Sequence, residues 1–157
     1  MLSPSVRKEW PFEPSWFSHR DGRLHYVDAG PRDGPVLLCL HGNPSWSFLF
    51  RHLLRELQDG FRVVALDHLG CGLSEKPPAG PYGLQAHIDR AEALIAHLGL
   101  DRFSLAVHDW GGAIGMGVAT RRPDAVQSSS SRTLRPSCPT ASRGRSRSVG
   151  REASARS

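Results

Sequence analysis

The 157-residue sequence has no long hydrophobic run. Its longest unbroken apolar stretches hold about five residues, far fewer than the roughly 20 that a helix needs to span a bilayer. The N-terminal stretch MLSPSVRKEWPFEPSW has no apolar region of the kind that signal peptides carry. These absences argue against a membrane protein and against a secreted one, so we expect a soluble, cytoplasmic chain.

Cysteine is scarce as well. Cys39, Cys71 and Cys138 form no CxxC spacing, and an odd number of cysteines does not suit a disulfide framework. Cys39 lies in the apolar run VLLCL, where we expect a buried thiol. The cysteines therefore predict neither a disulfide-stabilised fold nor a metal site, and we expect no metal and no cofactor.

Positive charge is confined to one end of the chain. The formal net charge is +5, but residues 128–157 contain seven Arg and one Glu with no Lys or Asp, a net charge of +6. The remaining 127 residues therefore carry 5 − 6 = −1. Because the body is close to neutral, we expect neither a nucleic-acid partner nor a membrane partner. Nothing in the charge pattern predicts an oligomeric state.

The first 127 residues alternate between strand and helix patterns. The segments WFSHR and RLHYVDAG, separated by Asp21-Gly22, predict a β-hairpin, whereas residues 1–15 contain three prolines and predict an irregular lead-in. Apolar residues at helical spacing predict helices over residues 48–58, 84–100 and 111–122. Three continuous apolar runs are typical of strands covered on both faces: VLLCL (36–40), RVVALD (62–67) and FSLAV (103–107). A hairpin followed by three strand–helix pairs is typical of a mostly parallel α/β sheet flanked by helices.

This pattern stops at about residue 127. Residues 128–157 hold ten serines and seven arginines without periodicity, so we divide the chain into an α/β part (1–127) and a tail (128–157) that we expect to be disordered. With no strand predicted after residue 127, the strand FSLAV is expected to form an open apolar edge.

The tail has two interpretations. A Ser/Arg-rich segment can bind RNA or be phosphorylated. Alternatively, a GC-rich gene is read out of frame here, because serine codons of the TCN type contain valine and leucine codons in an offset frame. We favour the out-of-frame interpretation, and a genuine truncated form with a new tail is the alternative.

The stretch VHDWGG (107–112) places one residue, Asp109, between a predicted strand and a predicted helix. This is the pattern of a nucleophile elbow, where serine is the usual residue. A carboxylate is already ionised at neutral pH and can attack an alkyl carbon without a general base. The product is an ester that water must hydrolyse, which is covalent catalysis in two steps. The sequence therefore predicts Asp109 as a nucleophile for alkyl transfer.

The stretch HGNPSW (41–46) directly follows the strand VLLCL. Turns at the carboxyl ends of parallel strands face the crevice where open α/β sheets bind ligands, so this turn and Asp109 are expected to converge. In the alternative interpretation, Gly42 and Pro44 only shape a loop and Asn43 is a turn residue.

Three motifs in the same order, HGNPSWSFLFR, DHLGCGLSEKP and VHDWGG, resemble the haloalkane dehalogenase branch of the α/β-hydrolase superfamily over roughly residues 10–127. The resemblance implies an α/β-hydrolase fold and a nucleophilic Asp109. It implies that the side-chain N–H groups of Asn43 and Trp110 hold the leaving halide and that their backbone N–H groups hold the oxyanion of ester hydrolysis. The substrates implied are a small alkyl halide and water.

The remaining residues near these motifs are interpreted as supporting ones. His41 and His108 flank the predicted site without matching the water-activating base of the resembled family. Gly111 is expected to permit close packing of helix and strand, and Gly42 to shape the turn. We therefore assign supporting roles to His41, Gly42 and Gly111.

Two further functions stay open. The motifs are also similar to the β-lactone decarboxylase of long-chain olefin biosynthesis. A non-catalytic fragment with a basic tail is an alternative from a different class. An epoxide hydrolase is disfavoured, because the resemblance to that group calls for an aromatic residue at the position of Asn43.

The predicted site is incomplete. In the resembled superfamily the nucleophile is followed along the chain by an acid and then a histidine. All eight histidines, from His19 to His108, precede Asp109. The cap and the last strands of that fold are not predicted either. We therefore interpret the chain as the truncated or frame-shifted N-terminal part of such an enzyme, inactive by itself.

Overall fold

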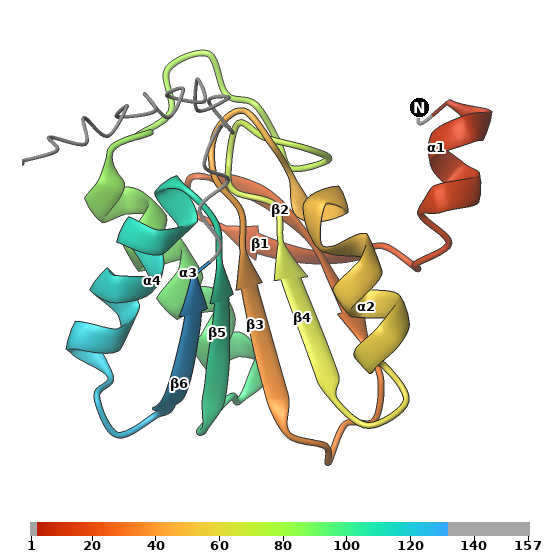
Figure 1. The fold of residues 1–157 in the computed structure, drawn as a ribbon. Helices are drawn as coiled ribbons and strands as arrows, with labels where there is room; N and C mark the ends of the chain where they lie inside the picture. Colours follow the sequence, from red (N-terminus) through yellow and green to blue (C-terminus); the bar gives the residue numbers. More distant parts are fainter. Residues whose placement is uncertain (1–2, 132–157) are drawn as a thin grey trace, which may run out of the picture.

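The computed structural model describes residues 3–131, which form a six-stranded sheet with helices on both faces (Figure 1). The strands are β1 (Ser15–His19), β2 (Gly22–Ala29), β3 (Val36–Leu40), β4 (Arg62–Leu66), β5 (Phe103–Val107) and β6 (Val126–Ser131). The helices are α1 (Pro4–Glu9), the short 3-10 helix η1 (Ser47–Phe50), α2 (Arg51–Leu57), α3 (Leu84–Leu98) and α4 (Trp110–Arg121). Among these helices, none is long and apolar enough to cross a membrane.

The strand order is β1-β2-β4-β3-β5-β6. The predicted hairpin is confirmed, since β1 and β2 pair antiparallel with His19 opposite Gly22. Strand β2 also pairs antiparallel with β4, whereas β4, β3, β5 and β6 are mutually parallel. The mostly parallel α/β sheet expected from the apolar runs is therefore confirmed. The carboxyl ends of β3, β4 and β5 consequently lie at one edge of the sheet (Figure 1).

Two apolar layers hold the sheet between its helices. Helices α3 and α4 cover one face, where Leu94, Ile95 and Ile114 pack against the strands. Helix α2 packs beside β4 on the other face, with Leu54 fully buried. Cys39 lies in this second layer without solvent exposure, so the expected buried thiol is confirmed, and burial raises the pKa of that thiol. The strands are thus fixed from both sides.

The N-terminal segment differs from the prediction. Residues 1–15 were expected to be irregular, yet Pro4–Glu9 form the helix α1. The Ser3 side chain accepts a hydrogen bond from the Val6 N–H, and Pro4 stands in the first turn. Both are established helix-start signals, because the hydroxyl satisfies a free N–H and proline has none to satisfy. The predicted helix over 48–58 also begins differently, as the 3-10 turn η1.

The segment after residue 127 differs from its prediction more than the N-terminal segment does. Strand β6 runs from Val126 to Ser131, pairs parallel with β5, and crosses the predicted boundary between body and tail. The Ser128 hydroxyl donates a hydrogen bond of 2.9 Å to the Ser104 hydroxyl of β5. The predictions of an irregular segment from residue 128 and of an open edge at β5 are therefore wrong for residues 128–131. Residues 132–157, on which the disordered and out-of-frame interpretations also rest, lie outside the described residues.

Candidate active site

Asp109 occupies a sharp turn between β5 and α4. Its backbone has φ +51° and ψ −124°, and no other non-glycine residue between positions 3 and 131 has a positive φ. Such a conformation costs about 1–3 kcal/mol for a residue with a side chain and persists only where the surroundings impose it. The Gly112 N–H donates to the Asp109 carbonyl at 2.8 Å and closes the turn. This is the geometry that the elbow pattern predicts.

Two glycines allow the elbow to sit against the end of β3. A Cβ on Gly111 would lie 2.0 Å from the carbonyl oxygen of Leu40, so any side chain there would force the first turn of α4 away from the sheet. A Cβ on Gly42 would lie 2.5 Å from both Cβ and Oδ1 of Asp109. The turn after β3 and the elbow after β5 therefore approach each other more closely than any other residue type permits.

The structure brings Asn43 and Trp110 to this meeting point. The Asn43 N–H donates to Oδ1 of Asp109 at 3.3 Å, and the peptide bond between Asn43 and Pro44 is cis. Asn43 and Trp110 both line a hollow of about 370 Å³, and Trp110 is 53% exposed. The start of the 12-residue helix α4 adds a positive partial charge beside the carboxylate. The arrangement can hold an anion beside a carboxylate.

His41 lines the same hollow as Asn43 but is almost completely buried. Its side chain is buried, with Nδ1 bonded to the Gly42 carbonyl at 2.8 Å and Nε2 accepting from the His68 N–H at 2.9 Å. Burial lowers the pKa of His41 below its usual value. Both ring nitrogens are occupied, so His41 contacts the turn rather than a reacting atom.

His108 lies on the opposite side of the elbow. It lines a different hollow with Leu49 and Leu53, on the α2 face of the sheet. Its Nδ1 is buried and makes no hydrogen bond within the described part of the chain. No hydrogen bond joins any histidine to Asp109 in that part of the chain.

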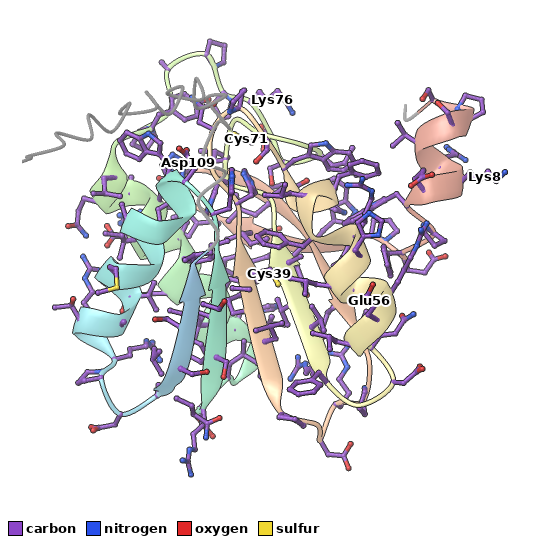
Figure 2. All side chains as sticks on the ribbon, in the orientation of Figure 1. Lys8, Cys39, Glu56, Cys71, Lys76 and Asp109 are labelled. Atoms are coloured by element: carbon purple, nitrogen blue, oxygen red, sulfur yellow. The ribbon has the colours of Figure 1, made fainter. Side chains whose placement is uncertain are left out.

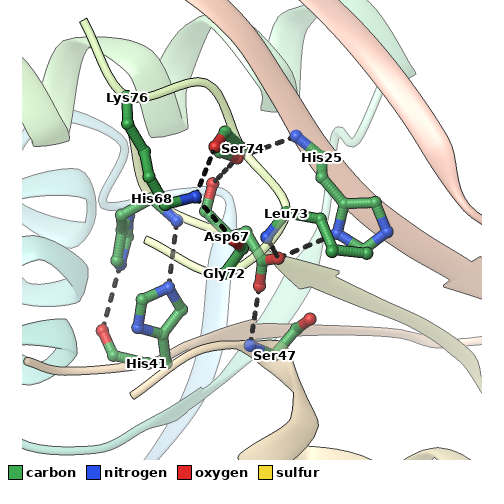
Figure 3. Close-up of polar contacts among 9 residues, drawn as sticks. All are labelled: His25, His41, Ser47, Asp67, His68, Gly72, Leu73, Ser74 and Lys76. Atoms are coloured by element: carbon green, nitrogen blue, oxygen red, sulfur yellow. Dashed lines mark hydrogen bonds and ion pairs between the residues drawn. The ribbon is translucent and has the colours of Figure 1, made fainter. Parts of the chain in front are cut away.

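A second carboxylate, Asp67, organises the loop that follows β4 (Figure 3), and residues of this loop line the hollow. Its oxygens accept from the Ser47 N–H at 2.7 Å, the Leu73 N–H at 2.8 Å and Nδ1 of His25 at 2.9 Å. Burial by itself would raise the pKa of Asp67, but these hydrogen bonds outweigh it and hold the pKa below its usual value. Asp67 is therefore a buried anion with its charge compensated.

Asp67 begins the motif DHLGCGLSEKP, which by itself predicted no role for this carboxylate. The signal that could have identified it is a carboxylate placed directly after the buried strand RVVAL, where an ionised group needs several donors. The donors come from three segments far apart in the sequence, which a linear pattern does not show.

The loop from Asp67 to Lys76 carries polar groups into the hollow. His68 and Cys71 lie in its wall, and Lys76 donates to the carbonyls of Gly72 and Ser74 at 2.7 and 3.0 Å. Figure 2 shows Cys71 and Lys76 at the same end of the molecule as Asp109. His87 completes the wall from α3; burial and the nearby Arg90 lower its pKa to about 4. Residues 3–131 contain no group of three or more His, Cys, Asp or Glu side chains placed to hold a metal ion.

Comparisons with known proteins agree with this geometry. The chain is 48% identical over 118 residues to haloalkane dehalogenase 2 of Mycobacterium tuberculosis, covering 75% of this chain and 41% of that protein. It is 45% identical over 119 residues to cis-3-alkyl-4-alkyloxetan-2-one decarboxylase of Xanthomonas campestris, covering 70% and 40%. The tetrameric haloalkane dehalogenase DpaA of Paraglaciecola agarilytica superposes with a TM-score of 0.73 at 32% identity, covering 82% and 47%.

The chain spans about two fifths of the length of these curated relatives. A family model described as the alpha/beta hydrolase fold matches residues 35–132, which include the turn after β3, the Asp67 loop and the elbow. Sheet order, elbow geometry and this match agree, and the chain belongs to the α/β hydrolase fold family.

Proposed function

We propose that this chain carries the nucleophile and the anion-binding part of a hydrolase site of the haloalkane dehalogenase type. The observation that supports this most strongly is a carboxylate, Asp109, at the strained elbow within hydrogen-bond distance of the Asn43 N–H. Oδ1 accepts that bond, which leaves Oδ2 as the attacking oxygen.

In the proposed reaction, a lone pair on Oδ2 of Asp109 forms a C–O bond with an alkyl carbon. The C–halogen bond breaks, and its electron pair leaves with the halide. The side-chain amide of Asn43 and the indole N–H of Trp110, which line the same hollow, donate to the departing halide. The product is an ester between Asp109 and the alkyl group.

Hydrolysis of that ester requires a base to activate water. The resulting oxyanion on the Asp109 carbonyl would be held by the backbone N–H groups of Asn43 and Trp110. Every histidine of the sequence precedes Asp109, and the ring nitrogens of His41 are already bonded. We therefore propose that this chain by itself stops at the ester and does not turn over.

Stoichiometric labelling tests the proposal directly. The 157-residue chain is incubated with 1-bromobutane, and intact-mass and peptide mass spectrometry are expected to show one butyl group on Asp109. Asp109→Asn should abolish the label. Asp124→Asn, which alters another exposed carboxylate, should keep it. A butyl group on a different carboxylate would contradict the assignment of the nucleophile.

A second candidate function is supported by the 45% identity to the Xanthomonas decarboxylase, whose name gives a β-lactone as its substrate. A cis-3,4-dialkyl oxetan-2-one distinguishes the two. Release of alkene, or an adduct on Asp109 with the mass of the whole lactone, combined with no butyl label favours the decarboxylase. If neither compound modifies the protein, the non-catalytic alternative is favoured.

A further inference from the structure

One carbonyl oxygen beside the elbow accepts an unusual number of hydrogen bonds. The Gly42 oxygen accepts from Nδ1 of His41 at 2.8 Å, from the Ser45 hydroxyl at 3.0 Å and from the Ser45 N–H at 3.1 Å. The same peptide unit carries the Asn43 N–H, which donates to Asp109. Because a peptide unit is planar, donors that fix the direction of its oxygen also fix the direction of its N–H.

The protonation state of His41 follows from its partners. A backbone N–H can only donate, so the His68 N–H requires an unprotonated Nε2 on His41. The ring proton is then on Nδ1, where it faces the Gly42 oxygen. In the other tautomer, two lone pairs would face each other across 2.8 Å. His41 is thus a neutral donor with a defined direction.

His68 holds His41 from a second side. Its Nε2 lies 3.0 Å from the His41 carbonyl oxygen, which can only accept, so this nitrogen carries the proton (Figure 3). The two rings lie 4.4 Å apart, and both residues are buried. The peptide units on both sides of Gly42 therefore each have an imidazole N–H on their oxygen.

We propose that His41, held in its Nδ1–H tautomer by His68, is a positioning residue that aims and polarises the Asn43 N–H toward the Asp109 carboxylate. Donors on a carbonyl oxygen draw electron density through the peptide unit and strengthen the N–H at its other end. In the resting protein this N–H holds Oδ1 and leaves Oδ2 free. In the ester it would face the oxygen on which negative charge develops. Only this chemical consequence depends on the proposed function.

Two matched variants of His41 differ in whether an N–H donor still faces the Gly42 oxygen. The amide nitrogen of asparagine occupies the place of Nδ1, so His41→Asn retains a donor toward the Gly42 oxygen. The amide nitrogen of glutamine occupies the place of Nε2, so His41→Gln loses that donor. Ser45→Ala removes one of the other donors from the same oxygen and leaves His41 intact.

Nuclear magnetic resonance of the 15N-labelled chain, recorded without substrate, provides the first measurement. Long-range 1H–15N spectra should show the proton of His41 on Nδ1. The Asn43 amide proton should move upfield in His41→Gln, by a smaller amount in Ser45→Ala, and least in His41→Asn. A His41 proton on Nε2, or an Asn43 amide that none of the variants moves, would overturn the proposal.

The rate of butyl transfer to Asp109 provides the second measurement. No oxyanion forms during butyl transfer, so in this step the Asn43 N–H acts by orienting the carboxylate. Because a misplaced reacting atom slows a reaction, the loss of aim in His41→Gln is expected to slow labelling about tenfold. His41→Asn should recover most of the rate, which a purely structural role of the imidazole would not produce. Equal slowing in both variants, with equal thermal midpoints, counts against positioning. An unlabelled wild-type chain with the expected Asn43 shifts would contradict the proposed function and leave the positioning intact.

Discussion

Two aspartates stand at the carboxyl edge of the same sheet, and their surroundings are opposite. Asp67 follows β4 directly, has no solvent exposure and accepts hydrogen bonds from His25, Ser47 and Leu73. Asp109 follows β5 by two residues, is exposed, and accepts one bond of 3.3 Å. Each is pressed against a glycine: a Cβ on Gly72 would lie 2.2 Å from Oδ2 of Asp67, as one on Gly42 would lie 2.5 Å from Oδ1 of Asp109.

The two carboxylates differ in how many of their oxygens are engaged by donors. Asp67 has both oxygens engaged by donors, so its charge stabilises the loop from Asp67 to Lys76 and has no free lone pair directed at solvent. Asp109 is held by a strained backbone and one weak bond, so one oxygen is available. Both aspartates stand at a strand end, and the number of hydrogen-bond donors distinguishes the buried Asp67 from Asp109, for which we propose the nucleophilic role.

The largest expected effect follows from removing the charge of Asp67. Asp67→Asn leaves N–H donors buried around a neutral amide, and loss of one partner of a buried charged network costs about 3–5 kcal/mol. The free energy of unfolding, measured with urea, should fall by that amount. Asp109→Asn is the matched control and should change it by less than about 1 kcal/mol. Equal losses in the two variants would remove the distinction between the two aspartates.

Gly42→Ala tests how closely the two turns must approach. Its methyl group would overlap Cβ and Oδ1 of Asp109, so the carboxylate has to move. Overpacking of this kind costs about 1–3 kcal/mol, and the displaced oxygen should transfer the butyl group roughly 10–100-fold more slowly. Gly60→Ala is a suitable control, since nothing lies within 4 Å of its Cβ position. Unchanged labelling in Gly42→Ala would show that the approach is not needed.

Asn43→Ala tests the proposed anion site beside the exposed Asp109. The variant keeps the backbone N–H that contacts Asp109 and removes the side-chain amide proposed to hold halide. Bromide titration should quench Trp110 fluorescence in the wild type. The variant should require higher bromide, by the equivalent of about 1–3 kcal/mol for one hydrogen bond to a charged group. Identical titration curves would assign the anion to other donors.

The smallest expected effect is a pH dependence at His87. Its folded pKa of about 4 lies below the ordinary value of 6.5, so the unfolded chain binds more protons between these two values. The part of the free energy of unfolding that depends on neutral His87 is therefore fully present above pH 6.5 and is lost as the pH falls toward 4. In His87→Gln, the free energy of unfolding should depend less steeply on pH over this range, by at most the slope that corresponds to about one bound proton. His52→Gln, the same substitution at an exposed histidine, is the matched control.

Much of the architecture was predictable because it depends on local apolar patterns. The runs predicted as strands at 36–40, 62–67 and 103–107 form β3, β4 and β5, with β4 ending at Leu66, and the elbow motif places Asp109 between a strand and a helix, as the structure does. The turn with Asn43 converges on it, as strand-end geometry requires. These features could be predicted from the spacing of apolar residues and from the rule that the carboxyl ends of parallel strands meet at one edge of the sheet.

Other features were not predictable, because their causes are not local. The donors around Asp67 come from β2, the first residue of η1 and the loop after β4, and no single stretch contains them. The insertion of β4 between β2 and β3 has no signature in either strand. Strand β6 was missed because its serines lack the apolar residues by which strands are recognised.

Strand β6 has a consequence of its own. Register in a sheet is normally enforced by the hydrophobic pattern, since a shift by one residue exposes every buried side chain. In the run Ser128–Ser131, such a shift places another serine at three of the four positions, so these side chains impose little penalty. Pairing with β5 already contains an irregularity between Phe103 and Leu105. Alignment is thus enforced mainly by Val126, which packs against the core, and by the hydrogen bond from Ser128 to Ser104, and a one-residue shift is expected to become easier where these contacts are lost.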